Sequence, residues 1–556
     1  MNRYVYLFEY RRTPLRGYER ELGCMEVVAL AGTARRRGEV LRVESHQPIP
    51  VSRLRGVTFF ERVTVISPDG LREEIIPDQV ILEKSARAVR ASSPAHAKRL
   101  LEKVEDIPNA GREHTYLSHA WHQYKGKFYP QLVRSTFVIA GLLEGSRVFD
   151  PFVGSGTTLV ETYLQNLVGY GIDLNPLAAY LSRAKVQCLK ASPDLVEEEI
   201  DALLRRVVDR TADLGIDDEL FGAMEGAPRR SRRSIDHCTL PNIGYLSRWF
   251  DVEALDKLTL LVDEVQRVRD CRVSMLMWLT VSNLLRDFSL QDPQQLRIQR
   301  RKDAPPSRRL LYRFVVDLRH NARAISAIVA LRERMSLKDF DQYVACADAR
   351  DLKTAGIPEL LVDGQVDHIV TSPPYATALP YIDTDRLSMF LLSLLKPDQR
   401  SSLEFRMIGS REIRKRDKRR LEEELAANMT AGRPELPASV LGFIRRLRDL
   451  NRSVQVGFRR ENLPSLLLKY FRDMADVLQE MARVLRPGGY CVIIIGNNRT
   501  VAGHQLVDIP TGDLLVDIAA KKGLRLWKAL DMTDQPAYLP HSQNGIRSET
   551  ILFFQR

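Results

Sequence analysis

The chain has 556 residues, more than one ordinary domain holds, and this length predicts roughly three or four compact units. Hydrophobic residues make up 44% and charged residues 28% of it, a composition that excludes a disordered protein. Lys and Arg number 83 against 71 Asp and Glu, so the formal net charge is +12. This excess is compatible with a polyanionic partner, because each phosphate contact releases condensed counterions.

Cysteine usage and hydropathy limit the setting of the protein. The 6 cysteines include no CxxC pair, so neither a structural zinc site nor a disulfide framework is predicted. The N-terminal stretch MNRYVYLFEYRRTP has no long apolar core and no small-residue cleavage site, which argues against a signal peptide. No stretch reaches the ~18 apolar residues of a membrane span. We therefore expect a soluble cytoplasmic protein with no bound metal and no membrane association.

Residues 1–110 are expected to form a small N-terminal α/β accessory domain. The segments YVYLFEY (4–10) and VTFFERVTVIS (57–67) are rich in Val, Phe and Tyr, which predicts strands. Between them, GYERELGCMEVVALAG (17–32) has the apolar spacing of an amphipathic helix. A further helix is expected from the stretch that begins ASSPAHAKRLLEKV at residue 91.

Tight alternation of strands and helices begins after residue 110. SRVFD (146–150) predicts a short buried strand, a helix is expected to begin near Thr157, and LVGYGID (167–173) predicts a second strand. This is one half of a doubly wound sheet. Near the C-terminus, residues 469–498 predict a helix, a Pro-Gly-Gly turn and a buried strand, and GLRLWKALDM (523–532) and SETILFFQR (548–556) predict two closing strands. We expect the chain to divide into a first catalytic part at 111–190, a helical insertion at 191–340, a second catalytic part at 341–395, a basic helical insertion at 396–465 and a C-terminal catalytic part at 466–556.

The segment DPFVGSGTT (150–158) lies at the end of the first strand of this sheet. Gly154 and Gly156 allow the backbone to approach a ligand where a Cβ would collide. Leu159 stands where the dinucleotide fingerprint has its third glycine, so that fingerprint is incomplete. A glycine turn that serves only helix packing is the alternative interpretation of this segment.

Acidic residues follow the next two strands. In GIDLNP, Asp173 lies at the carboxyl tip of a strand, where an acid can accept both hydroxyls of a ribose, and Asn175 begins the next turn. In CADARDL, Asp348 follows a third strand and could accept a hydrogen bond from an adenine amino group. Together with the glycines, these acids predict a site for a cofactor that contains a nucleoside.

The segment TSPPY (371–375) follows the strand HIVT and predicts the catalytic turn. Its two prolines fix φ and have no N–H, so the turn is rigid and its carbonyls are free to accept. The Ser372 hydroxyl or carbonyl and the Pro373 carbonyl can accept both hydrogens of an amino group on an aromatic base, which localises the nitrogen lone pair. Tyr375 can stack on the base and stabilise developing positive charge. The catalytic residues are therefore expected to be Ser372, Pro373, Pro374 and Tyr375. A structural Pro-Pro turn is the alternative for this segment alone.

The two segments together resemble motifs I and IV of the amino-methylating DNA methyltransferases that use S-adenosyl-L-methionine. HTYLSHAWHQYKGKFYPQLVR (114–134) resembles motif X of that family, GIDLNP motif II and CADA motif III, and ARVLRPGGYCVIIIGNN resembles a later strand. The resemblance implies a Rossmann-like class I methyltransferase sheet within an α/β fold. It also implies cofactor contacts from Tyr124, Lys127, Phe128, Pro130, Asp150, Phe152, Gly154, Gly156, Thr157, Thr158, Asp173, Asn175, Asp348 and Ala349.

The form SPPY resembles the cytosine-N4 branch of that family more than the adenine-N6 branch, which usually has DPPY. The implied activity is methylation of an exocyclic amino group, with cytosine N4 as the target, in double-stranded DNA by base flipping. Many SPPY enzymes carry motif IV before motif I, whereas here motif I comes first. RNA enzymes keep the present order, and the N-terminal region faintly resembles tRNA guanosine-N2 methyltransferases with THUMP domains. Methylation of tRNA guanosine N2 and of adenine N6 in DNA are the alternatives.

Dense basic runs occur at 227–234, 296–309 and 411–420, within or beside the two insertions. Such a run is often only a solvated helix face, but its position here predicts phosphate contacts and makes the insertions candidates for target recognition. A restriction or defence-system partner is compatible with the family. The non-enzymatic alternative is a nucleic-acid-binding module built on a degenerate methyltransferase fold.

Overall fold

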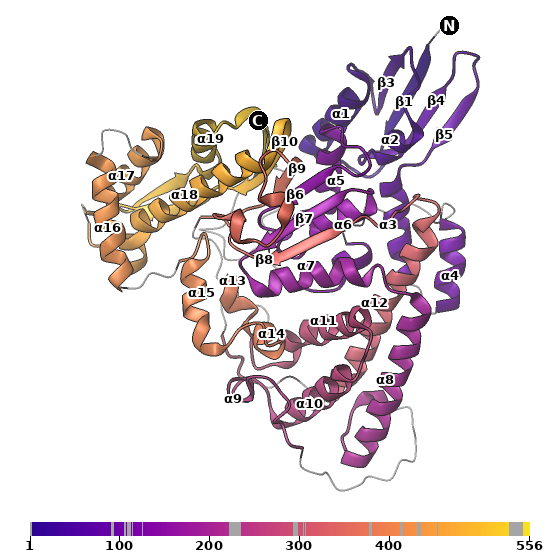
Figure 1. Cartoon of the computed structure of the whole chain (residues 1–556), viewed down its shortest axis with the longest axis vertical. Helices are drawn as coiled ribbons and strands as arrows, with labels where there is room; N and C mark the ends of the chain where they lie inside the picture. The colour runs from indigo at the N-terminus through magenta and orange to yellow at the C-terminus, as the bar shows by residue number, and fades with distance from the viewer. Residues whose placement is uncertain are drawn as a thin grey trace.

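The computed structural model describes residues 3–556 apart from 91–93, 105–106, 108–112, 114, 125, 222–234, 293–298, 304, 306, 377–380, 412–414, 431–434, 453 and 533–548. A five-stranded sheet lies at the N-terminal end of the molecule and a seven-stranded sheet at its centre (Figure 1). A helical body covers one end of the central sheet, and the helices of the C-terminal third lie on its other side (Figure 1).

The N-terminal sheet is antiparallel and has the order β2-β3-β1-β4-β5. Alternate side chains of its central strand, Tyr6, Phe8 and Tyr10, are buried, because successive side chains of a strand point to opposite faces. The predicted strands at 4–10 and 57–67 and the predicted helix at 17–32 are confirmed. The elements are β1 (Tyr4–Tyr10), α1 (Gly17–Ala31), β2 (Arg35–Arg37), β3 (Val40–Ser45), α2 (Val51–Gly56), β4 (Phe60–Ile66) and β5 (Arg72–Ile75).

Two helices follow the N-terminal sheet, α3 (Asp78–Val89) and α4 (Pro94–Glu102). Helix α4 is predicted by the stretch that begins at residue 91, whereas α3 is not predicted from the sequence. Both pack against α12 (Leu310–Arg332) of the first insertion, so they share its hydrophobic cluster and not that of the N-terminal sheet. A buried ion pair between Arg11 and Glu83, with 2.5 Å between Nη1 and Oε2, ties the end of β1 to α3.

The central sheet has the order β13-β14-β10-β9-β6-β7-β8. Its strands β10, β9, β6, β7 and β8 run parallel to one another, and β14 is antiparallel to both β10 and β13. The strands predicted after residues 110 and 340 and at the C-terminus are all present. They are β6 (Arg147–Asp150), β7 (Val168–Asp173), β8 (Gln342–Cys346), β9 (Val366–Thr371), β10 (Leu485–Gly496), β13 (Arg525–Asp531) and β14 (Glu549–Gln555).

Helices cover both faces of the central sheet, which confirms the predicted α/β, Rossmann-like fold. On β6, Val148 packs in the cluster that contains α5 (Pro130–Ile139), whereas Phe149 packs in the cluster of α18 (Phe458–Val484) and α19 (Thr511–Lys521) on the other face. Helix α6 (Thr157–Leu164) packs beside α5, and α7 (Pro176–Cys188) packs beside α6. A sheet buried on both faces requires the nearly continuous apolar runs seen in VIIIG of β10.

The helices of 191–340 continue one hydrophobic cluster with α6 and α7. They are α8 (Pro193–Leu214), α9 (Ile243–Leu246), α10 (Val252–Gln266), α11 (Cys271–Phe288) and α12. Helix α11 packs directly on α7, so the first insertion is anchored to the second strand-helix unit of the sheet.

The helices after β9 are α13 (Tyr381–Thr384), α14 (Arg386–Leu391), α15 (Arg400–Arg406), α16 (Lys415–Thr430) and α17 (Ala438–Arg452). Helix α14 packs on α11, whereas α16 and α17 pack on α18. Helix α18 begins at Phe458, so the boundary expected at residue 465 falls inside this helix.

Two details of the C-terminal part differ from the sequence analysis. The Pro-Gly-Gly segment lies within β10, where the pairing register with β9 shifts between Leu485 and Tyr490, and does not form a separate turn before the strand. A hairpin of β11 (Asn498–Ala502) and β12 (Gln505–Ile509) was not predicted. Within the described ranges, no helix is long and apolar enough to cross a membrane.

Gly171 on β7 is expected to be intolerant of a side chain. A Cβ there would lie 2.7 Å from Val153 Cγ2 and 2.9 Å from Leu159 Cδ1, so Gly171→Ala forces the turn after β6 and α6 away from the sheet. Overpacking of this kind costs about 1–3 kcal/mol, and we expect a lower thermal unfolding midpoint by calorimetry. Gly442→Ala on α17 is the matched control, since a Cβ there meets nothing within 4 Å. An unchanged midpoint for Gly171→Ala would contradict this packing.

Candidate active site at the carboxyl edge of the central sheet

The turn after β6 brings two glycines against α7. Gly154 and Gly156 have φ of +51° and +85°, a region that favours glycine, and Gly156 is the N-cap of α6. A Cβ on Gly156 would lie 2.8 Å from Ser182 Cα, and the Ser182 hydroxyl donates to the Gly154 carbonyl at 2.8 Å. The turn is therefore held tightly against α7, and Thr157 at the start of α6 is buried.

Asp173 ends β7 directly beside this turn. One of its carboxylate oxygens accepts from the Gly154 N–H at 3.0 Å and the other from the Asn175 N–H at 2.8 Å. A carboxylate offers about four acceptor positions, so two stay open for a further donor. Burial raises the pKa of Asp173 to about 7, although the two backbone N–H groups oppose that rise.

Asp150 lies beneath the edge and uses both of its oxygens within the chain. Oδ1 accepts from the Thr371 hydroxyl at 2.6 Å and from the Phe152 N–H at 3.0 Å, and Oδ2 accepts from the Thr158 hydroxyl at 2.5 Å. Burial raises its pKa to about 6. These bonds join the turn after β6 to the end of β9. The predicted contact of Asp150 with the cofactor stays a prediction.

The predicted catalytic turn follows Thr371 at the same edge. Pro373 is buried, Ser372, Pro374 and Tyr375 are half-buried, and the Tyr375 hydroxyl donates to Glu549 Oε1 at 2.7 Å. Gly409, with φ of +76°, lies so close that a Cβ on it would be 2.8 Å from the Tyr375 carbonyl oxygen. Sequence reasoning missed Glu549 and Gly409, because they are distant in the chain and belong to no recognised motif.

The region that resembles motif X lies partly over the glycine turn. Tyr124 Cε1 is 3.4 Å from the position of a Cβ on Gly154. The Lys127 ammonium donates to the carbonyl oxygens of His119 and His122, at 3.3 and 2.5 Å, and burial lowers the pKa of Lys127 to about 8. Phe128 packs in the apolar cluster with α5, and Pro130 is the first residue of α5. His114 and Lys125 lie outside the described residues.

A buried carboxylate that the sequence analysis missed anchors this region. Glu161 on α6 accepts from the Tyr116 hydroxyl at 2.7 Å, contacts His119 Nε2 at 2.9 Å and accepts from Arg134 Nε at 3.4 Å. The loop is also tied to the first insertion, because His122 Nε2 lies 3.0 Å from the Ser282 hydroxyl of α11. Helices from two parts of the chain thus position the segment that resembles motif X.

The third predicted acid has an internal partner. Arg350 binds Asp348 through Nε at 2.9 Å and Nη2 at 2.6 Å, and it also contacts Asp473 of α18 at 3.1 Å. This guanidinium lowers the pKa of Asp348 against the effect of burial, which alone would raise it. Ala349 is buried, and Phe152 packs in the same hydrophobic cluster. An adenine amino group at Asp348 would use the acceptor positions that Arg350 leaves open.

Two of the basic runs contain side chains that are ion-paired within the described residues. Arg308 and Arg309 contact Asp217 and Glu219, and Lys418, Arg419 and Arg420 contact glutamates of α16 and α18. Phosphate contacts by these side chains would have to compete with such pairs. The run at 227–234 lies outside the described residues. Within the ranges that the structure describes, no group of three His, Cys, Asp or Glu side chains could hold a metal ion.

The edge has the features that a nucleoside-containing cofactor requires. The glycine turn forms a cradle that a Cβ on Gly156 would disturb, and Asp173 has open acceptor positions beside it. Asn175 lies two residues after Asp173, and its Nδ2 is buried with no hydrogen-bond partner among the described residues. A donor and an acceptor thus adjoin the glycine turn, and the residues present fit the cofactor that the resemblance implies.

Comparison with known proteins bears on this resemblance. The chain is similar to the type II methyltransferase M.MvaI of Kocuria varians, with 24% identity over 416 residues that cover 73% of this chain and 81% of the relative. The resemblance to methyltransferases is confirmed. M.MjaII of Methanocaldococcus jannaschii is 34% identical over 20% of this chain and 21% of its own, and M.AvaI of Anabaena variabilis is 28% identical over 30% and 32%. No protein-family model matches the chain.

Solved structures add little to these relationships. A DNA modification methylase of Thermus thermophilus in complex with S-adenosyl-L-methionine is 19% identical, with a TM-score of 0.15 over 16% of this chain and 38% of that one. TrmN from Thermus thermophilus is 11% identical, with a TM-score of 0.29 over 100% and 99%. At these scores the structures do not superpose as wholes, and no argument below rests on them.

Thr371→Val is expected to weaken the junction between β6 and β9. It removes a hydroxyl donor from the buried Asp150 carboxylate, a loss of about 1–3 kcal/mol in the free energy of unfolding. The pKa of Asp150 is about 6, so the carboxyl is ionised at pH 7.5 and largely protonated at pH 5. The loss should therefore be larger at pH 7.5, which urea unfolding at both pH values measures. Thr64→Val on β4 is the control, and equal losses at both pH values would exclude this role for Asp150.

Proposed function

We propose that the protein is an S-adenosyl-L-methionine-dependent DNA methyltransferase that methylates an exocyclic amino group, with cytosine N4 as the target. The observation that carries this proposal is the hydrogen bond from Thr371 to Asp150. Through it, the Ser372–Tyr375 turn is held at the same sheet edge as the glycine turn and Asp173. A methyl donor at one turn and an amino group at the other would then be neighbours, which methyl transfer requires.

The cofactor would be held by the groups that surround the glycine turn. Asp173 accepts the ribose hydroxyls, the backbone from Gly154 to Gly156 lies against the cofactor, and Asp348 accepts from the adenine amino group. Tyr124 closes over the glycine turn, and Lys127 stabilises the loop that carries Tyr124 through its bonds to two carbonyls. When bound, the cofactor supplies an electrophilic methyl group.

The catalytic turn prepares the acceptor nitrogen. The lone pair of an amino group on an aromatic base is delocalised into the ring, which makes the nitrogen a poor nucleophile. The Ser372 hydroxyl or carbonyl and the Pro373 carbonyl accept the two amino hydrogens, so the nitrogen becomes more tetrahedral and its lone pair localises. No general base is needed, because the nitrogen proton becomes acidic once the methyl group is attached and leaves to solvent.

Tyr375 receives the base and stabilises its developing positive charge. Its hydroxyl is bound to Glu549, so the ring is fixed before the base arrives. A base in duplex DNA must leave the stack to reach this edge, and flipping costs a few kcal/mol of stacking, which contact with Tyr375 partly offsets.

The choice of DNA and of cytosine rests on two observations. The relatives M.MvaI and M.MjaII are named as type II methyltransferases, and Ser372 stands where the adenine-N6 branch usually has Asp. The net charge of +12 is compatible with a nucleic-acid partner. We propose that the insertions at 191–340 and 396–465 recognise the target and that residues 1–110 are accessory. A restriction or defence-system partner stays a prediction.

The product of the enzyme tests this proposal directly. Expression in a host that lacks methylated cytosine should yield N4-methylcytosine in digested DNA by nucleoside mass spectrometry. N6-methyladenine in DNA, or N2-methylguanosine in tRNA, would replace cytosine as the target and would identify one of the two alternatives. A protein that binds DNA and no S-adenosyl-L-methionine would instead be a binding module built on this fold.

Variants of the catalytic turn serve as controls for this measurement. Tyr375→Ala should lower kcat at least ~100-fold, since it removes the ring that receives the base. Ser372→Ala separates the two acceptors of Ser372, because a similar loss assigns the hydroxyl and an unchanged kcat assigns the carbonyl. Their affinity for S-adenosyl-L-methionine, measured by calorimetry, should stay within about threefold of wild type. An equal loss of cofactor binding would contradict the division of roles between the two turns.

The affinity for S-adenosyl-L-methionine should depend on pH through Asp173. Its pKa of about 7 is raised, so the carboxylate that accepts the ribose hydroxyls is lost as the pH falls from 8 to 6, and affinity should drop up to about tenfold. Asp173→Asn should bind more weakly at pH 8 and lose most of this pH dependence. Titration of the cofactor itself appears equally in both proteins, so an identical slope in the variant would exclude Asp173.

A further inference from the structure

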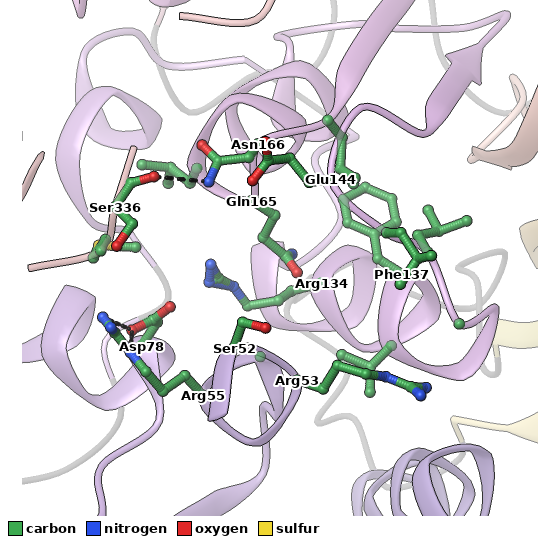
Figure 2. A pocket seen from close by; sticks show the side chains of 18 of the residues that line it. Ser52, Arg53, Arg55, Asp78, Arg134, Phe137, Glu144, Gln165, Asn166 and Ser336 are labelled. Carbon is green, nitrogen blue, oxygen red and sulfur yellow. Dashed lines mark hydrogen bonds and ion pairs between the residues drawn. The ribbon is translucent and has the colours of Figure 1, made fainter. Parts of the chain in front are cut away.

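A pocket lies at the edge of the central sheet where the parallel strands begin, opposite the edge that carries the candidate active site. Its walls are α2, the start of α3, α5 and the loops that precede β6, β7 and β8, and its volume is about 230 Å³ (Figure 2). The candidate active site lies at the carboxyl ends of the same strands. The two sites are therefore separated by the length of the strands, and no residue that lines this pocket was assigned a role above except Arg134, which contacts Glu161.

Two side chains in this pocket carry hydrogen-bond donors that the protein does not use. Arg134 on α5 is 0% exposed, and its Nη1 and Nη2 have no hydrogen-bond partner among the described residues. Gln165 follows the end of α6, and its buried Nε2 also has no hydrogen-bond partner among the described residues. Figure 2 shows the Arg134 guanidinium pointing into the pocket, with Asp78 on one side and Gln165 on another. Buried donors without acceptors are costly, so they indicate a ligand that supplies acceptors.

The acidic groups that line the pocket are already paired. Arg55 binds Asp78 through Nε at 2.9 Å and Nη2 at 2.8 Å, and Lys338 pairs with Glu144. Asn166 is also engaged, since it donates to the Ser336 carbonyl at 2.9 Å and accepts from the Lys338 N–H at 2.8 Å. Glu161 is the counterion on the Nε side of Arg134, and Asp78 also interacts electrostatically with this guanidinium. The unpaired donors of Arg134 and Gln165 therefore lie beside acidic groups whose charges are already balanced by other residues.

We propose that this pocket binds a small molecule through an oxyanion, a phosphate or a carboxylate group, held by Arg134 and Gln165. The two terminal nitrogens of a guanidinium form a planar fork that matches two oxygens of such a group. The Gln165 amide supplies a third donor, and Ser52 on α2 lines the same space. A concave pocket of this size accommodates a small molecule with one such group, whereas the backbone of duplex DNA is too broad to enter it.

Occupancy of the pocket would be transmitted to the cofactor turn. The Arg134 guanidinium contacts Glu161, and Glu161 in turn holds Tyr116 and His119 of the loop that covers the glycine turn. An oxyanion on Nη1 and Nη2 fixes the guanidinium plane and with it the position of Glu161. This contact path links the two edges of the sheet through α5 and α6.

The test uses the full-length protein in chloride buffer and two probes, inorganic phosphate and malonate, at matched ionic strength. One of the two should raise the thermal unfolding midpoint in a saturable way, because a ligand that binds only the folded state stabilises it. Saturation by phosphate alone identifies a phosphate group, and saturation by malonate alone identifies a carboxylate. If neither probe exceeds the effect of added chloride, the proposal is wrong.

Two variants keep the test independent of folding. Gln165→Glu places a negative charge beside the oxyanion and should weaken probe binding at least tenfold. Arg134→Lys keeps the charge beside Glu161 but removes the fork, and it should weaken binding as well. Gln187→Glu on α7, a half-buried glutamine outside the pocket, is the matched control and should bind as wild type does. Wild-type binding by Gln165→Glu would overturn the assignment.

Discussion

The Asp150 carboxylate is fully buried and accepts hydrogen bonds from the hydroxyls of Thr158 and Thr371. These threonines come from the helix after the first strand and from the end of a strand far along the chain. A buried carboxylate needs such donors, since its desolvation is otherwise too costly. The requirement works in both directions, because the same bonds align the glycine turn with the Ser372–Tyr375 turn. The relative position of the glycine turn and the Ser372–Tyr375 turn therefore depends on the Asp150 carboxylate.

Much of the central fold could be predicted because its signals are local. Short apolar strands followed by Gly154 and Gly156, by Asp173 and by Ser372 mark the carboxyl edge of a parallel sheet, and the structure brings these residues to one edge. Helix α3 escaped detection because its buried face contains Glu83 and Lys84, whose charges hide the apolar period. The Pro-Gly-Gly segment was expected to form a turn, but pairing with neighbouring strands keeps it within β10. Tertiary pairing here outweighs local preference.

The residues of the site that were missed share one property, which is that they act through contacts between distant segments. Glu161 is an ordinary helix residue in sequence, yet it gathers Tyr116, His119 and Arg134. Gly409 and Glu549 both contact Tyr375 from later parts of the chain, 34 and 174 residues away in sequence. Asp150 begins a recognised segment, but the contacts of its oxygens with Thr158 and Thr371 are visible only in the structure. Sequence motifs indicate the candidate site, whereas the contacts that support it appear only in the fold.

The position of the first insertion has a consequence for the order in which the molecule assembles. Thr371 and Asp150 are 221 residues apart, and closing a flexible loop of that length costs about 5 kcal/mol of chain entropy. Helices α8 to α12 lie within this loop and pack on one another and on α7, so they can form before the loop closes. Once these helices have folded, the long flexible loop is replaced by a compact body whose ends lie close together. We therefore expect the insertion to act as a scaffold during folding and β9 to pair with β6 late.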